Sequence, residues 1–165
     1  MSINIYPKLS GYFAEDLRKG YLFELYIRNL FNERNFKVLN HRNTLATGNK
    51  QLPTSYFSLP DLELLFIRNN TYRLAVECKW RKKSFKLTRK DQEKIQIYKK
   101  YQKEENIRVF IAIGIGGEPS NPERLFVTPL DYISNFSEIE EGDLIEFKRK
   151  TTRRFFYDTV QLKLF

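Results

Sequence analysis

Two neighbouring stretches near the middle of the chain are rich in branched and aromatic residues. Residues 61–67 and 72–80 carry this pattern, and the polar segment 68–71 between them contains two asparagines. Apolar runs on both sides of a turn-forming segment predict two antiparallel β-strands that form a hairpin. Because side chains alternate along a strand, Glu77 and Lys79 are expected on a charged face of the second strand, opposite an apolar face.

Helical and strand patterns alternate along the rest of the chain. Residues 88–105 contain neither Gly nor Pro, and Thr88 stands three residues before Asp91, which is typical of a helix start. Residues 109–115 are a continuous apolar run, as in a strand that is covered on both faces. In chain order the pattern predicts a helix at 19–31, a strand at 36–42, the hairpin, a helix at 88–105, a strand at 109–115, a short strand at 125–127 and a helical turn at 129–133.

The register of the hairpin decides whether Asp61 lies near Glu77. A strict two-residue turn sets Asp61 opposite Cys78, on the other face of the sheet. A three-residue turn or a bulge sets it opposite Glu77 or Lys79 instead. We therefore predict an odd-numbered loop or a bulge in this hairpin.

Two carboxylates and an amine at this place indicate metal-assisted chemistry on a phosphate ester. Asp61 and Glu77 offer the hard oxygen ligands that Mg²⁺ takes one or two at a time, together with water and substrate phosphate. Lys79 adds a positive charge that positions or deprotonates an attacking water, or neutralises the transition state. Glu63, on the same strand face as Asp61, either adds a ligand or only opposes a residue of the neighbouring strand. The alternative to a site is an amphipathic edge hairpin with its charges in solvent.

Glu24 stands at the margin of the apolar stripe of the first helix. It lies three residues before Ile27 and seven before Phe31, both of which are on that stripe. A carboxylate in this position is costly to bury unless it is paired or bound to metal. Glu24 therefore either belongs to the site or reaches solvent and pairs with Arg28.

Three motifs together resemble the PD-(D/E)xK nuclease superfamily. They are Lys19-Gly20-x-x-x-Glu24 on the first helix, Pro60-Asp61 at the start of a strand, and Glu77-Cys78-Lys79 near the end of the next strand. The resemblance spans about residues 17–128. It implies an α/β, restriction-endonuclease-like fold with an αβββαβ core, in which helices flank a mixed central sheet.

The resemblance also implies roles for individual residues. Asp61 and Glu77 are expected to ligate Mg²⁺, for which Mn²⁺ substitutes, and the backbone carbonyl of Cys78 completes the site. Lys79 assists the attacking water. Glu24 contributes through a second metal ion or an outer-shell water, and DNA is favoured over RNA as the substrate.

The helix that follows Lys79 departs from one pattern of the superfamily. Some members carry Gln-x-x-x-Tyr on this helix, whereas here Gln92 is followed at that spacing by Gln96, and Tyr98 is preceded by Lys94. The Gln-x-x-x-Tyr motif is therefore absent. Lys94 and Gln96 either reach the phosphate or lie on a solvated helix face.

Basic residues are concentrated beside the predicted site. Between Lys79 and Lys103 the sequence has eleven Lys or Arg residues against two acidic ones, a balance of +9 that equals the net charge of the whole chain. This concentration favours a phosphate-binding surface, although a solvated basic helix gives the same pattern. A second cluster at 148–154 is either a further backbone contact or a charged hairpin. The residues predicted to contact nucleic acid are Arg81, Lys82, Lys83, Lys86, Arg89, Lys90 and Lys94.

Length and composition indicate one nuclease-like domain over residues 1–165. A chain of 165 residues with 41% hydrophobic content can bury a sizeable core, and it has no internal repeat. We expect the core at about 17–128 and a C-terminal extension at 129–165. The long loop at 43–59 leads into Asp61, and it is expected to be mobile or to border the substrate groove.

Several other kinds of site are not supported. Cys78 is the only cysteine, which excludes an intrachain disulfide and a CxxC metal site, and a single thiol suits a reducing cytoplasm. His41 is the only histidine, so a zinc site built from histidines is excluded and a surface or strand-end role is favoured. Residues 114–117 lack the third glycine of a dinucleotide loop and predict a turn. No segment has the length of a membrane span, and no membrane partner is expected.

These features leave two functional classes. The first is a Mg²⁺-dependent endonuclease with Asp61, Glu77 and Lys79 at its centre and Glu24 in support. The second is a catalytically silent module with the same fold that binds nucleic acid or docks a partner. Because cutting two strands with one small active site requires two copies, a symmetric homodimer is expected for the enzyme.

Overall fold

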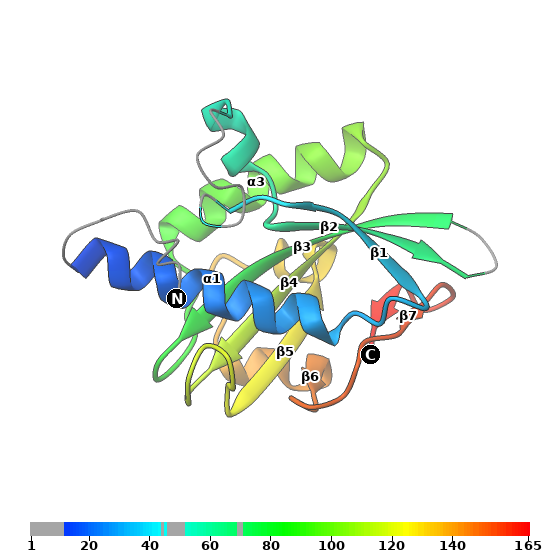
Figure 1. Cartoon of the computed structure of the whole chain (residues 1–165). Coiled ribbons are helices and arrows are strands. Elements are labelled where there is room, and N and C mark those ends of the chain that lie inside the picture. Colours follow the sequence, from blue (N-terminus) through cyan, green and yellow to red (C-terminus); the bar gives the residue numbers. More distant parts are fainter. Residues whose placement is uncertain (1–11, 44, 46–51, 69–70) are drawn as a thin grey trace, which may run out of the picture.

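A six-stranded mixed sheet forms the centre of the computed structural model, which describes residues 12–43, 45, 52–68 and 71–165. Its strands lie side by side in chain order: β1 (Phe36–His41), β2 (Leu62–Ile67), β3 (Thr71–Arg81), β4 (Arg108–Ile115), β5 (Arg124–Pro129) and β6 (Lys148–Arg149). The helices are α1 (Tyr12–Leu30), α3 (Arg89–Glu104), α4 (Leu130–Ile133) and the 3-10 helices η1 (Thr54–Ser58) and η2 (Glu141–Phe147). A separate hairpin pairs β7 (Tyr157–Asp158) with β8 (Lys163–Leu164). Helices cover both faces of the sheet (Figure 1).

The order of strand pairing follows from the connections between strands. β3 and β4 are parallel and are joined by α3, whereas all other neighbouring strands of the sheet are antiparallel. A parallel pair needs such a crossover because the chain must return to the same end of the sheet. β4 has a neighbour on each side and seven of its eight residues are buried, which explains its continuous apolar sequence.

Alternation along β3 separates two apolar layers. Val76 points into the layer beneath α1, where it shares a core cluster with Phe23. Ala75, its neighbour in sequence, belongs to the opposite layer together with Tyr98 of α3. This alternation places Glu77 and Lys79 on the α3 side of the sheet.

The C-terminal extension packs against the end of α1. Phe155, Tyr157 and Leu164 are buried in the same cluster as Phe31. The rings of Phe31 and Phe155 meet edge to face with their centroids 4.9 Å apart, a favoured arrangement of aromatic pairs. In Figure 1 the red C-terminal hairpin accordingly lies next to the segment that connects α1 with β1.

The predicted order of elements is confirmed, with small differences at their ends. Helix, three strands, helix and strand follow one another as α1, β1, β2, β3, α3 and β4, and the predicted helical turn is α4. α1 already includes Tyr12, well before the predicted start at residue 19. Residues 114–117 include the predicted turn, in which Gly116 and Gly117 have φ angles of 72° and 59° that favour glycine.

Part of the loop at 43–59 is helical. Within the described part of that loop, residues 54–58 form η1, and the ring of Tyr56 lies 5.4 Å from the guanidinium carbon of Arg42. Residues 44 and 46–51 lie outside the described residues, so the mobility predicted for this loop stays a prediction.

None of the described helices is long and apolar enough to cross a membrane.

Candidate active site

The hairpin of β2 and β3 has the register that brings Asp61 to Glu77. Ile67 pairs with Thr71, which leaves three residues between the paired ends, and the ladder continues without a shift to Leu62 and Val76. One step further along the same register, Asp61 falls opposite Glu77. The prediction of an odd-numbered loop is therefore confirmed.

Asp61 is held between the ends of β1 and β3. Its backbone carbonyl accepts a 2.7 Å hydrogen bond from the amide of Arg42. Its side-chain Oδ2 accepts a 2.8 Å hydrogen bond from the amide of Cys78. The carboxylate thus satisfies a backbone donor of β3 at the point where the ladder with β2 has ended.

Glu77 is almost fully enclosed, with 3% of its surface exposed. Its Oε1 lies 3.4 Å from the Lys79 ammonium and 3.2 Å from the Lys94 ammonium. Burial acts to raise the pKa of Glu77, but the two lysines outweigh it, so the pKa is lowered and the side chain is an anion. Its other oxygen, Oε2, is buried, and within the described part of the chain neither this oxygen nor the hydroxyl of Tyr98 makes a hydrogen bond of good geometry. The hydroxyl of Tyr98 is nevertheless near enough to Glu77 to help lower its pKa.

The electrostatic environment of Asp61 disfavours its charge. Burial raises the pKa of this carboxyl well above its usual range, and the negative charges of Glu77 and Glu24 raise it further. The amide of Cys78 and the more distant Lys94 act in the opposite direction without cancelling these effects. A bound cation would remove this penalty, because it would screen the two carboxylates from each other.

Lys79 is an ammonium ion within this structure. Its Nζ lies 2.8 Å from Asp91 Oδ1, and its side chain is only 11% exposed. Burial acts to lower the pKa of Lys79, but Glu77 and Asp91 outweigh burial and the pKa is raised. A protonated lysine positions a water or stabilises negative charge, and it has no free electron pair with which to accept a proton.

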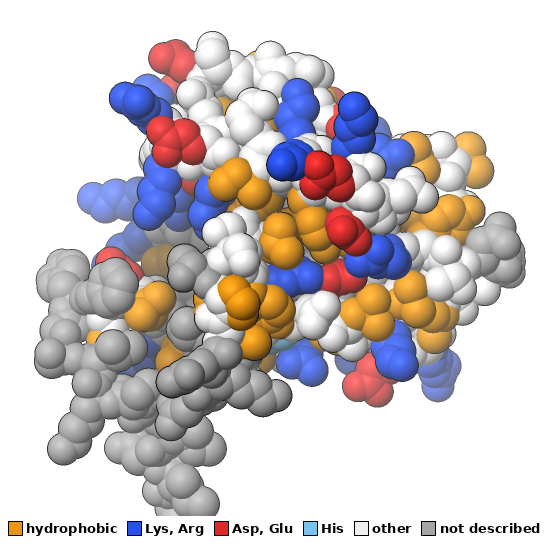
Figure 2. Space-filling view, turned by 90° about the horizontal axis from the view of Figure 1, so that it is seen from above, with side chains coloured by type: hydrophobic (Ala, Val, Ile, Leu, Met, Phe, Trp, Pro, Cys, Tyr) orange, Lys and Arg blue, Asp and Glu red, His pale blue; other side chains and the backbone are white. Residues whose placement is uncertain are grey.

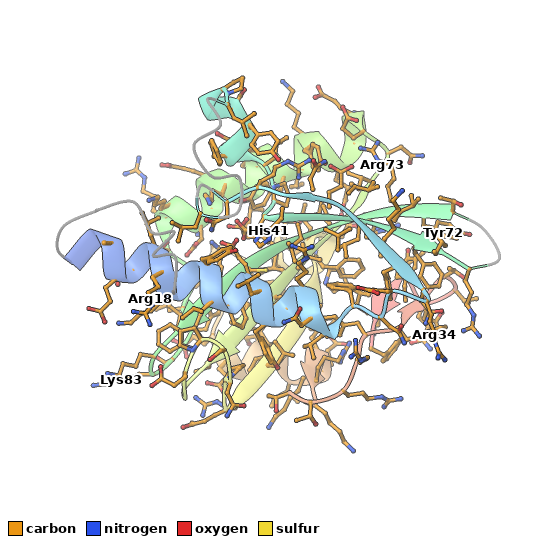
Figure 3. The ribbon with its side chains drawn as sticks, in the orientation of Figure 1. Arg18, Arg34, His41, Tyr72, Arg73 and Lys83 are labelled. Carbon is orange, nitrogen blue, oxygen red and sulfur yellow. The ribbon has the colours of Figure 1, made fainter. Side chains whose placement is uncertain are left out.

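Glu24 occupies a separate polar cluster at the edge of the site. Its Oε2 lies 2.7 Å from Nε2 of His41, and both of its oxygens accept hydrogen bonds from the amide group of Asn43. The ring of Tyr21 stacks on His41 with a centroid separation of 5.6 Å. In Figure 3 His41 lies between α1 and the end of β1. The predicted strand-end position of His41 is confirmed, since this residue closes β1.

The described carboxylates of the site offer two candidate metal ligands and not a group of three. Among the described residues, no three His, Cys, Asp or Glu side chains are grouped so that they could enclose a metal ion. Asp61 and the unpartnered Oε2 of Glu77 nevertheless suit Mg²⁺, which binds one or two carboxylates and completes its shell with water and substrate oxygens. The ligand roles of Asp61, Glu77, Glu24 and the Cys78 carbonyl stay predictions.

Glu63 belongs to a different, structural cluster. It lies opposite Ala75, as one of the two alternatives for this residue predicts. Its carboxylate pairs with the buried guanidinium of Arg42 and, at 2.7 Å, with Arg73. It also accepts hydrogen bonds from Asn40 and Tyr101. These partners occupy both oxygens of Glu63, which explains how a carboxylate is buried here without a metal ion.

Comparison with known proteins supports the fold. No protein-family model and no curated protein matches the sequence. A solved structure that is similar is that of Hjc from Archaeoglobus fulgidus, a Holliday junction resolvase from an archaeal hyperthermophile. The two share 15% sequence identity with a TM-score of 0.52 over 85% of this chain and 99% of the resolvase, which is a restriction-endonuclease-like protein. The chain has the restriction-endonuclease-like fold.

The basic residues predicted to bind nucleic acid lie at the end of β3, in the segment that follows it and on the first turns of α3. Five of them are exposed: Lys82, Lys83, Lys86, Arg89 and Lys90. Lys94 is part of the site itself through its contact with Glu77, whereas Gln96 is exposed on α3. On the face seen in Figure 2, Lys and Arg side chains are interspersed with acidic and hydrophobic ones, and Lys83 points away from the body of the molecule in Figure 3. Contact of these residues with nucleic acid stays a prediction.

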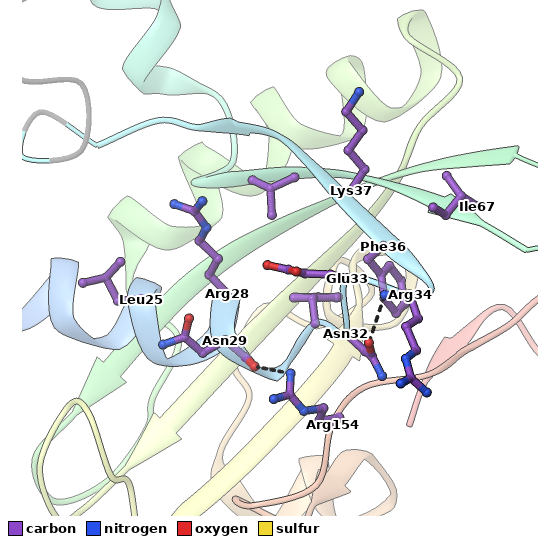
Figure 4. Close-up of a pocket in the computed structure, with 12 residues that line it drawn as sticks. Leu25, Arg28, Asn29, Asn32, Glu33, Arg34, Phe36, Lys37, Ile67 and Arg154 are labelled. Carbon is purple, nitrogen blue, oxygen red and sulfur yellow. Dashed lines mark hydrogen bonds between the residues drawn. The ribbon is translucent and has the colours of Figure 1, made fainter.

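A second basic surface borders an open groove of about 1160 Å³ between α1 and β1 (Figure 4). Arg28, Arg34, Lys37 and Arg154 line it around an apolar floor that includes Phe36. Arg154 donates a 3.3 Å hydrogen bond to the carbonyl of Asn29, so part of the predicted 148–154 cluster is anchored to α1. The groove is lined by the two elements that also carry Glu24 and His41. Arg28 follows Glu24 by about one turn of α1, and Lys37 lies on β1 with His41.

Three features of this site were not predicted from the sequence. Asp91 was predicted only as the helix-capping partner of Thr88, but it also binds Lys79. His41 was considered without its partner Glu24. Tyr98 was noted only for lacking a glutamine four residues before it, but burial, followed by the nearby charge of Glu77, raises its pKa. A signal for Tyr98 was present, because Lys94 and Tyr98 share one face of α3 at a spacing of four residues.

Proposed function

We propose that the protein is a Mg²⁺-dependent nuclease that hydrolyses phosphodiester bonds of DNA. The observation that carries this proposal is that Asp61, whose charge is disfavoured partly by Glu77, lies opposite that residue, and that Glu77 has a buried oxygen without a hydrogen bond within the described residues. Such an arrangement is unfavourable in the protein alone and is relieved by a divalent cation. Strongly shifted carboxyl groups of this kind are typical of functional sites.

The side chains divide the expected tasks among them. Asp61 and Glu77 would hold the ion, and the Cys78 carbonyl, next to the amide that already binds Asp61, would add a third oxygen. When bound, Mg²⁺ supplies polarisation of the phosphoryl oxygen and makes a coordinated water more acidic. Lys79 stabilises the negative charge that develops on the phosphate, and Glu24 orients an outer-shell water.

One observation favours a nucleic-acid substrate, and a second suggests DNA. The exposed lysines and arginines between Lys82 and Lys90 form a sequence-independent phosphate-binding surface next to Lys79. The structurally similar Hjc is a Holliday junction resolvase, so a four-way DNA junction belongs among the substrates. Symmetric cleavage of a junction requires two active sites, which a homodimer would provide.

The experiment incubates the purified chain with plasmid, linear duplex, single-stranded DNA and a four-way junction. Reactions contain Mg²⁺, Mn²⁺ or EDTA, and products are resolved on denaturing gels. We expect cleavage of at least one substrate with either metal ion, no cleavage with EDTA, and a loss of about a thousandfold for Asp61→Asn and Glu77→Gln. Glu105→Gln, a change of an exposed carboxylate on the far end of α3, serves as the matched control.

The same experiment separates this proposal from a catalytically silent module. Binding of DNA without cleavage under all metal conditions would identify the fold as a nucleic-acid-binding scaffold. Cleavage that persists in Asp61→Asn and Glu77→Gln would show that the reaction takes place elsewhere.

A further inference from the structure

Asp91 makes two different sets of contacts with its two carboxylate oxygens. Oδ2 accepts hydrogen bonds from the backbone amide of Thr88, at 3.0 Å, and from its hydroxyl, at 2.6 Å. The bond from the amide of Thr88 belongs to the capping box that starts α3, in which the amide of Asp91 donates in return to the hydroxyl oxygen of Thr88. Oδ1 lies 2.8 Å from the ammonium of Lys79 on β3. One residue therefore links the first turn of α3 to the predicted catalytic lysine.

Of the two carboxylates that contact Lys79, Asp91 is the closer. Glu77 Oε1 lies 3.4 Å from Lys79 and is shared with Lys94, which is closer to it at 3.2 Å. Glu77 is also a proposed ligand of the cation, so its charge is drawn toward that ion when the ion is present. Asp91 is then the carboxylate that remains to hold Lys79.

Burial gives this contact its strength. The side chains of Lys79 and Asp91 are 11% and 6% exposed, so water competes weakly for either group. A lysine side chain has a flexible stem of four carbons, and it loses much conformational freedom when its ammonium is held in one place. Because an oriented charge is far more effective than a mobile one in a site of this kind, holding the ammonium in advance increases transition-state stabilisation.

We propose that Asp91 is the positioning residue for Lys79, holding its ammonium at the place where charge develops on the scissile phosphate. This inference rests on the proposed nuclease function. It extends the site beyond Asp61, Glu77, Lys79 and Glu24 and makes the start of α3 part of the catalytic arrangement. A capping residue without such a role would contribute only to the stability of the helix.

The chain offers a control that separates these two roles. Asp91→Asn keeps the size of the side chain and an oxygen that can accept from Thr88, but it removes the charge that binds Lys79. Thr88→Val removes the capping hydroxyl and leaves the pair of Lys79 and Asp91 in place. Asp91→Glu retains both the charge and a residue type that is common at this position of a capping box.

The first measurement is steady-state cleavage of a short DNA duplex or junction at saturating Mg²⁺. We expect Asp91→Asn to lower kcat by about ten- to a hundredfold with KM for DNA within threefold of the wild-type value, as for a misplaced catalytic group. Thr88→Val should stay within about threefold in kcat, and Asp91→Glu should recover a large part of the loss. A wild-type kcat in Asp91→Asn, or an equal loss in Thr88→Val, would overturn the proposal.

The second measurement does not depend on catalysis. Lysine-ammonium NMR signals of the metal-free protein, with Lys79 assigned through Lys79→Arg, report whether this ammonium is held and protected from exchange with water. We expect a slowly exchanging signal in the wild type and in Thr88→Val and its loss in Asp91→Asn. If the wild type cleaves nothing, the nuclease proposal fails, while this signal still decides whether Asp91 holds Lys79. Persistence of the signal in Asp91→Asn would contradict the role of Asp91.

Discussion

The amide of Cys78 donates a 2.8 Å hydrogen bond to the side-chain Oδ2 of Asp61. The ladder between β2 and β3 ends with the pair of Leu62 and Val76, so the carboxylate takes the place of a strand partner where the strands separate. The same group that is proposed to bind the cation therefore also satisfies a backbone donor of the sheet. Function and stability are coupled at this one residue.

This double role predicts different stabilities for two substitutions of Asp61. Asp61→Ala leaves the amide of Cys78 without its acceptor, which should cost about 1–3 kcal/mol. Asp61→Asn retains an acceptor oxygen and removes the disfavoured charge, so it should be at least as stable as the wild type in EDTA. Urea unfolding of the three proteins at neutral pH checks this order. An Asp61→Asn protein that is as unstable as Asp61→Ala would show that the charge itself is needed for folding.

The raised pKa of Asp61 predicts a pH dependence of the metal-free protein. Burial and the charges of Glu77 and Glu24 raise this pKa well above its usual range, so the folded state binds a proton that the unfolded state releases. Unfolding free energy should therefore fall as pH rises from about 4 through the folded pKa. We expect the fall to be absent in Asp61→Asn and to be reduced by Mg²⁺ in the wild type. Urea titrations in EDTA and in Mg²⁺ across this pH range provide the measurement.

The lowered pKa of Asp91 predicts that the unfolding free energy changes with pH in the opposite direction, in a lower pH range. Burial acts to raise its pKa, but hydrogen bonds from Lys79 and Thr88 outweigh this and lower it to about 2. Its contribution is complete above the usual pKa of an aspartate and is lost as pH falls toward 2, a change of about 1–2 kcal/mol. Acid unfolding should therefore begin at higher pH in Asp91→Asn than in Thr88→Val if Lys79 provides most of the effect. Circular dichroism of both variants between pH 2 and 5 tests this comparison.

Glu63 shows how a buried carboxylate differs from one in a metal site. Its oxygens are occupied by Arg42, Arg73 and neighbouring donors, whereas Glu77 retains an oxygen without a partner within the described residues. Glu63→Gln should lower the unfolding free energy by about 3–5 kcal/mol, because it leaves Arg42 buried without its counter-charge. It should not change the affinity for Mg²⁺ of the protein that remains folded. Chemical denaturation and metal titration by calorimetry measure the two effects separately, and a loss of Mg²⁺ affinity would move Glu63 into the site.

The sequence was sufficient for the order of helices and strands and for the relation of Asp61 to Glu77, because both depend on local periods. Strand alternation has a period of two, so the choice between an even and an odd loop decided the face on which Asp61 lies. Helix length and the cap at Thr88 were likewise set by neighbouring residues, and both agree with α3.

Contacts between elements far apart in the sequence were not predictable in this way. Glu24 and His41 meet because α1 crosses the sheet near the end of β1, and Asp91 meets Lys79 because α3 begins beside β3. The spacing of apolar residues predicts where a helix forms, but it does not predict where that helix packs on the sheet. The same holds for Arg154, which reaches α1 only because the C-terminal segment folds back on it.

The last prediction concerns the exposed basic residues before and along α3. Lys82, Lys83 and Lys86 are exposed near the end of β3 that carries Lys79, whereas Lys99, Lys100 and Lys103 are exposed on the distal half of α3. If the first three contact phosphates, replacing them with Ala should reduce the slope of log affinity against log salt by about 3. Replacing the second three removes the same charge but should change the slope by less than about 1, because these residues lie beyond the proposed contact surface. Fluorescence anisotropy of a labelled duplex in EDTA at several salt concentrations measures both slopes, and equal slopes for the two triple variants would show that only net charge matters.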